Sequence, residues 1–106
     1  MTALCLLLFA VQPCERQDAP DRILRHGPEE IRVYEQGRSL YLALRNLGQR
    51  PIHVDVVWRE LGFRGTARVF DLAADKDQGK VHAGFARKLA PGACAGYRVE
   101  PPAGSR

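Results

Sequence analysis

The chain has 106 residues, of which 45% are hydrophobic and 26% charged, and its formal net charge is +4. A chain of this length forms one domain at most, and it buries roughly two-thirds of its unfolded surface, which is enough for a single core. Its arginines and lysines are scattered along the sequence rather than gathered on one element, which argues against a nucleic-acid partner.

The N-terminus carries the apolar run ALCLLLFAV, residues 3–11. The run is much shorter than the about 20 residues of a membrane-spanning helix, so no membrane partner is expected. It has the length of a signal-peptide core, but no Lys or Arg precedes it and no small-residue cleavage site follows it. The location stays open: secreted or periplasmic if residues 1–14 act as a signal, and cytoplasmic otherwise.

Residues 12–28 hold three prolines and many charges. They offer few apolar contacts to offset the entropy of ordering the chain, so we expect a mobile, dispensable linker. The predicted organisation is an N-terminal apolar segment and linker over residues 1–28, followed by one domain over residues 29–101.

From residue 29 onward, apolar and polar side chains alternate, which is typical of half-buried strands. Turn residues separate six such runs, at 31–35, 39–45, 52–58, 66–72, 80–89 and 94–101. Residues 73–79, AADKDQG, are expected to form a polar turn, and no helix is expected after residue 28. The pattern predicts an all-β fold, an antiparallel two-sheet β-sandwich of Greek-key type. Its buried residues should include Leu42, Leu44, Val54, Val56, Val69 and Phe85.

Metal and cofactor sites have little support in the sequence. The three cysteines form no C-x-x-C pair; Cys94 is expected to be a small buried residue, whereas Cys5 and Cys14 could pair in an oxidising compartment. Asp75 and Asp77 begin a D-x-D-x-G run that lacks the further oxygen ligands of a calcium loop, so a turn is expected. The histidines, His26, His53 and His82, are isolated from one another in sequence.

Three aromatic residues are candidates for stacking on a sugar: Tyr41, Trp58 and Tyr97. Trp58 continues the face that carries Ile52, Val54 and Val56, which favours a place in the core or at a domain interface over a binding platform.

Residues 30–99 contain a series of short motifs in a particular order. Asn46-Leu47-Gly48 is followed by Leu61-Gly62-Phe63-Arg64-Gly65, then by Val69-Phe70-Asp71-Leu72-Ala73, Lys76-Asp77-Gln78-Gly79 and Ala90-Pro91-Gly92. This order resembles the C-terminal β-sandwich domain of the α-galactosidase (melibiase) family of glycoside hydrolases. The motif residues, to which the resemblance gives a structural role, are Asn46, Gly48, Leu61, Gly62, Gly65, Asp71, Leu72, Asp77 and Gly79.

The resemblance also implies what the chain lacks. In the family a catalytic barrel precedes this domain and carries both catalytic aspartates, and no position of the 106 residues matches either motif. No catalytic residue and no cofactor can therefore be carried over, and the chain alone is expected not to be an enzyme. The family's usual Trp after Asp-Leu is Ala73 here.

Two functions remain open at this stage. The first is an accessory domain that packs on a glycoside-hydrolase barrel, which in the family lies in the same chain, and stabilises it. The second is a free-standing β-sandwich that binds carbohydrate or protein.

Overall fold

The computed structural model describes residue 16 and residues 18–104. Eight strands and one short helix follow one another along this part of the chain. Their bounds are β1 (Arg22–His26), β2 (Glu29–Gln36), β3 (Ser39–Asn46), β4 (Ile52–Val57), α2 (Trp58–Leu61), β5 (Thr66–Asp71), β6 (Lys76–His82), β7 (Gly84–Leu89) and β8 (Cys94–Glu100). The predicted all-β class is confirmed.

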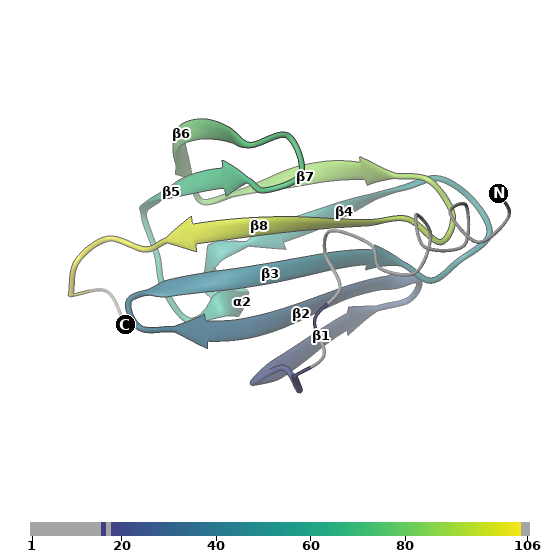
Figure 1. Cartoon of the computed structure of the whole chain (residues 1–106), viewed down its shortest axis with the longest axis horizontal. Helices are drawn as coiled ribbons and strands as arrows, with labels where there is room; N and C mark the ends of the chain where they lie inside the picture. The colour runs from purple at the N-terminus through teal and green to yellow at the C-terminus, as the bar shows by residue number, and fades with distance from the viewer. Residues whose placement is uncertain (1–15, 17, 105–106) are drawn as a thin grey trace, which may run out of the picture.

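The strands form two antiparallel sheets. The larger has the order β1-β2-β3-β8-β5-β6, and the smaller consists of β4 and β7. Figure 1 shows the large sheet with β4 and α2 behind it. We call the side of the large sheet that packs on β4 and β7 its inner face, and the opposite side its outer face.

The core lies between the two sheets. Leu42 of β3 pairs with Val33 of β2 and Tyr97 of β8, and all three side chains point to the inner face. Because successive strand residues alternate between faces, the period-two pattern of the sequence accounts for this core directly. Of the six residues expected to be buried, five are at most 1% exposed, and Phe85 packs on the core while half-buried.

A sharp bend at Ala83 and Gly84 moves the chain from the large sheet to the small one. Gly84 has a φ of +150°, and a Cβ at this position would lie 2.0 Å from the carbonyl oxygen of Val56. Only glycine allows this approach of two backbones. Ala83 stabilises the bend, since its N–H donates to the Gly65 carbonyl and its own carbonyl accepts from the Trp58 N–H.

The single turn α2 closes one end of the sandwich. Its Trp58 is 1% exposed, stacks on Phe63 at 5.2 Å between ring centroids, and donates its indole N–H to the Val81 carbonyl. Gly62 ends the turn in the left-handed conformation. No helix in the described part of the chain is long and apolar enough to cross a membrane.

Three expectations about the elements need correction. Residues 22–26, expected in a linker, form β1, because Leu24 faces Ile31 and packs on the core; residues 12–15 and 17 lie outside the described residues. The single strand expected over 80–89 is two strands, separated by the bend at Gly84. The turn expected over 73–79 is shorter, because β6 already begins at Lys76. In addition, one helical turn, α2, occurs where none was expected.

Candidate functional site

Asn46, the first residue of the motif series, connects three segments of the chain. Its side-chain amide donates to the carbonyls of Arg50 at 2.7 Å and of Leu89 at 3.1 Å, and its Oδ1 accepts from the Gly48 N–H at 2.9 Å. The residue is 1% exposed. Every polar group of this buried side chain therefore bonds to main chain, which fixes the β3–β4 turn against the end of β7.

A second buried polar group stands at the end of β5. Asp71 is 6% exposed, and its Oδ1 accepts from the Ala74 N–H at 3.2 Å. Arg87 of β7 donates to Asp71 Oδ2 at 3.1 Å and to the Tyr97 hydroxyl at 2.7 Å. This network joins the two sheets. Burial raises the pKa of the Tyr97 hydroxyl. A group that accepts a proton at neutral pH needs a lowered pKa instead.

The outer face of the large sheet presents a row of side chains across five strands. Strand pairing brings together Tyr34 of β2, Tyr41 of β3, Arg98 of β8, Phe70 of β5 and Asp77 of β6. The Arg98 guanidinium lies 4.3 Å from the centre of the Phe70 ring, and the two tyrosine rings meet edge to face at 5.6 Å. Aromatic rings and a guanidinium group thus lie side by side on this face, whereas most of the buried side chains of the inner face are aliphatic.

Asp77, which the sequence places in a calcium-like run, is engaged otherwise. Its Oδ1 accepts from the Gly79 N–H at 2.7 Å and its Oδ2 from Arg68 at 2.7 Å. The Arg68 guanidinium holds the pKa of this carboxyl below its usual value. The arrangement is that of an Asp-stabilised turn. Gly62, Gly65 and Gly79 all have the positive φ that such turns require.

No three side chains of His, Cys, Asp or Glu gather at metal-binding distance among the described residues. His26 contacts Glu60 at 3.1 Å, and His82 contacts the Thr66 hydroxyl at 3.3 Å. The histidines therefore lie at separate places on the surface, as their spacing in the sequence suggested.

A hollow of about 460 Å³ lies beside α2, at the end of the sandwich where the Trp58–Phe63 pair is buried. Its polar side chains come from Arg59, Arg64 and His82. A second hollow, of about 500 Å³, shares Arg59, Phe63 and Arg64 with it. The described lining of both is basic, so neither holds a carboxylate that could act on a glycosidic bond.

The three candidates for sugar stacking do not lie together. Trp58 and Tyr97 are 1% and 2% exposed, and both pack on Phe85 in the core. Tyr41 is on the outer face and half-buried. Neither of the two core rings has a free face to offer a sugar in this structure.

Cys94 differs from its expectation. It was expected to be a small buried thiol, but it is half-buried on the outer face and disulfide-bonded. Strand alternation places it on that face, next to Ala43 and the two tyrosines. The pairing of Cys5 with Cys14, which the sequence leaves open, concerns residues outside the described part of the chain.

Comparison with solved structures gives a consistent result. A GH27 β-L-arabinopyranosidase from Geobacillus stearothermophilus matches 80% of this chain with a TM-score of 0.71 and 22% identity. A putative α-N-acetylgalactosaminidase from Bacillus halodurans matches 76% at 0.68 and 16% identity, and α-galactosidase I from Mortierella vinacea matches 78% at 0.68 and 13% identity. The chain has the fold of one part of these glycosidases.

The chain spans only about a fifth of the matched enzymes, between 20% and 23% of their length in these three cases. No protein-family model and no curated protein matches it. At these identities the likeness concerns fold alone, and at that level the resemblance stated from the motif series is confirmed.

Some important residues escaped the sequence analysis. Arg87 and Arg98 organise the two polar arrangements described above, yet each appears in the sequence as an ordinary charged residue of a strand. Cross-strand register brings Arg98 to Phe70, whereas Arg87 meets Asp71 where the two sheets pack on each other. The alternation pattern could have placed Arg98 on the outer face, but it carries no information about which ring it meets.

Proposed function

We propose that this chain is a non-catalytic accessory β-sandwich domain that packs on a glycoside-hydrolase barrel and stabilises it. One observation carries the proposal: most of the chain superposes on about a fifth of several glycosidases, with TM-scores of 0.68 to 0.71. A fold that forms one part of an enzyme has a neighbour in that enzyme, and the rest of the matched chain is the natural candidate for it.

The state of the acidic residues supports a non-catalytic role. Glycosidases divide the work between two carboxyl groups about 5 to 9.5 Å apart across the bond to be cleaved. Here Asp71 pairs with Arg87, Asp77 with Arg68, and Glu30 with Arg32. For Asp77 the hydrogen bond from the Arg68 guanidinium lowers the pKa of the carboxyl group, which is the opposite of what a general acid requires.

The first test is enzymatic. The purified chain, assayed with an aryl α-galactoside beside a full-length enzyme of the family, should give no hydrolysis above background. Turnover by the chain that disappears in a variant lacking one carboxylate, such as Asp71→Asn, would contradict the proposal. It would show that a catalytic site has been overlooked.

The second test concerns stabilisation. We suggest preparing the arabinopyranosidase without the fifth that this chain matches and adding the purified chain in excess. The melting temperature of the truncated enzyme should rise saturably, as expected for a partner that binds the native state alone. An unrelated β-sandwich of similar size is the control. If neither the melting temperature nor sedimentation shows association, stabilisation of this barrel type is excluded.

The alternative, a free-standing carbohydrate-binding module, draws on Tyr41 and Phe70 of the outer face, where a ring and a guanidinium can together contact a sugar. Titration with galactose, followed by NMR, distinguishes the two. Saturable shifts of the Tyr41 and Phe70 signals would favour binding, and unchanged spectra at high galactose would favour the accessory role.

A further inference from the structure

The end of the sandwich at α2 carries two arginines whose charge is not balanced by the described chain. Arg59 lies within α2, Arg64 follows it by five residues, and both are exposed. Among residue 16 and residues 18–104, neither side chain forms a hydrogen bond or an ion pair. Arg68 and Arg87, by contrast, each pair with an aspartate. Both guanidinium groups at α2 are therefore available to a ligand.

The negative groups of the same helical turn are engaged by β1. The Glu60 carboxylate contacts His26 at 3.1 Å, and Arg22 donates to the Leu61 carbonyl at 2.9 Å. Both contacts draw the acid and a free carbonyl of α2 toward residues of the first strand. Positive charge thus remains on the side of α2 that Arg59 occupies.

Both arginines line the two hollows beside α2, of about 460 and 500 Å³. The first hollow adds His82 as a third basic side chain and has Val57 and Ala83 as apolar lining. Hollows of this size suit a small organic molecule. A bare inorganic ion would fill little of the space and would leave the apolar lining in contact with water.

Main-chain hydrogen bonds fix the walls of the first hollow. The Phe63 N–H donates to the Trp58 carbonyl at 3.2 Å, and the Trp58 N–H donates to the Ala83 carbonyl at 3.0 Å. The Ala83 N–H donates to the Gly65 carbonyl at 2.9 Å, which holds Ala83 at a φ of +66°, a value that residues other than glycine rarely adopt. The hollow therefore exists before a ligand arrives, which lowers the entropy cost of binding.

The charge of the lining favours a ligand with two negative charges. Guanidinium groups donate in pairs to phosphate oxygens, and a phosphate monoester carries a charge of about −1.5 to −2 at pH 7. Two arginines balance that charge, whereas a single carboxylate would leave one of them without a counter-charge. The described lining of both hollows contains no Asp or Glu that would repel an anion.

We propose that the hollow beside α2 binds a small organic phosphate monoester. Arg59 and Arg64 hold the phosphate group, and the organic part lies against the apolar lining of Val57, Phe63 and Ala83. The site is contained in this chain, so the proposal does not rest on the accessory function. Its failure would leave the proposed packing on a barrel unaffected.

Titration of the full chain with phenyl phosphate, followed by NMR, tests the site. Trp58 is the only tryptophan of the chain, so its single indole N–H signal reports on the hollow alone. This signal and the backbone amide signals of Arg64, Gly65 and Ala83 should shift saturably, with a dissociation constant of about 1 mM or lower. Unchanged signals at ten times that concentration would overturn the proposal.

Two further titrations separate the parts of the ligand. Inorganic phosphate keeps the charge but lacks the organic part, and benzoate keeps the ring but carries one negative charge. Each should bind about tenfold more weakly than phenyl phosphate. Equal affinity for inorganic phosphate would show a site for the free ion, and equal affinity for benzoate would show a carboxylate site. Either result overturns the proposal.

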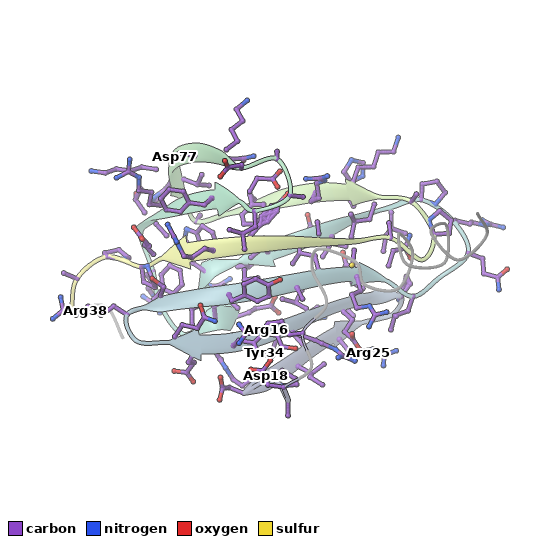
Figure 2. The ribbon with its side chains drawn as sticks, viewed as in Figure 1. Arg16, Asp18, Arg25, Tyr34, Arg38 and Asp77 are labelled. Carbon is purple, nitrogen blue, oxygen red and sulfur yellow. The ribbon has the colours of Figure 1, made fainter. Side chains whose placement is uncertain are left out.

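Charge-matched variants locate the phosphate. Arg59→Gln and Arg64→Gln should each weaken the binding of phenyl phosphate about tenfold, because each removes charge-assisted hydrogen bonds. The control is Arg25→Gln, which removes the same charge. Leu24 packs on the core, so Arg25 points to the outer face, and Figure 2 shows it beside β1.

The control should bind phenyl phosphate as tightly as the wild-type chain. An equal loss in Arg25→Gln would show a general attraction of anions to a basic protein, and unchanged affinity in both Arg59→Gln and Arg64→Gln would place the ligand elsewhere. Each outcome overturns the proposal. The amide spectrum of each variant shows whether it is folded, and since the two substitutions are independent, either one alone decides.

Discussion

The two faces of the large sheet bury side chains for different reasons. On the inner face Leu40, Leu42 and Leu44 of β3 are each 0% exposed beneath the small sheet. On the outer face Tyr34 and Ala43 are 3% exposed although no strand of the described chain lies over them. The first kind of burial follows from strand periodicity and the packing of the two sheets, and the second comes from neighbouring side chains of the same face, with Arg16 lying on the Tyr34 ring. Substitutions on the two faces should therefore differ in how much stability they remove.

The largest effect is expected on the inner face. Leu42→Ala removes a fully buried side chain between Val33 and Tyr97 and leaves a cavity in the middle of the sandwich. We expect the free energy of unfolding to fall by about 3 kcal/mol, measured by urea denaturation. Ser39→Ala, at an outward position of the same strand, is the control and should change it little. A loss below about 1 kcal/mol for Leu42→Ala would show that the small sheet packs loosely.

Asn46→Ala should come next. The substitution leaves the carbonyls of Arg50 and Leu89 without their side-chain donor in a buried place. Unpaired buried polar groups cost about 1 to 3 kcal/mol, so we expect a loss of about 2 kcal/mol. Gln49→Ala, an exposed change in the same turn, is the matched control. If the two variants unfold at the same urea concentration, water replaces the Asn46 bonds and the turn is not fixed by them.

A third experiment compares the faces by their response to pH. Burial raises the pKa of Tyr97 on the inner face, and burial also raises that of Tyr41 on the outer face. The unfolded chain then loses these protons first, near pH 10, so the stability is fully present below that pH and falls as the pH rises above it.

Replacement by phenylalanine separates the two contributions. Tyr97→Phe and Tyr41→Phe should each reduce the loss of stability between about pH 8 and pH 11, followed by urea denaturation at each pH. We expect the larger reduction for Tyr97, which is 2% exposed, because Tyr41 is only half-buried. Equal slopes in the wild-type chain and Tyr97→Phe would show that the Tyr97 hydroxyl is solvated in the folded state.

The sequence predicts the inner face well because one physical cause controls it. Apolar residues at alternate positions of β3 and β4 must share a face. This pattern identifies the core residues even when the pairing of the strands is unknown. The motif series does the same for the turns, since Asn46 and Asp71 bond to backbone within a few residues of themselves.

The remaining features depend on contacts that are distant in sequence. Arg87 meets Asp71 across the two sheets, and Arg98 meets Phe70 across β8 and β5. The division of residues 76–89 into two strands depends on Gly84 approaching Val56 of a different strand. β1 was assigned to a linker because its short, charged sequence shows only Ile23 and Leu24 as apolar residues, and its place in the sheet comes from pairing with β2.

The smallest effect is expected for the exposed ion pair of the outer face. Arg68 lies 2.7 Å from Asp77, and both side chains are solvent-accessible, at 53% and 39%. Exposed pairs contribute little because water and salt screen them. Because the folded pKa of Asp77 is lowered, the pair stabilises the fold above the usual pKa of aspartate and loses this effect as the pH falls through the lowered value.

Arg68→Gln should lower the melting temperature by a small fraction of the Leu42→Ala change, and this difference should vanish in acid or high salt. Asp77→Asn, which keeps an oxygen for the Gly79 N–H, and the double variant complete a cycle that isolates the charge interaction. A loss for Arg68→Gln as large as that for Leu42→Ala would mean that the outer face contributes to stability through its side-chain row, and the contrast between the two faces would then fail.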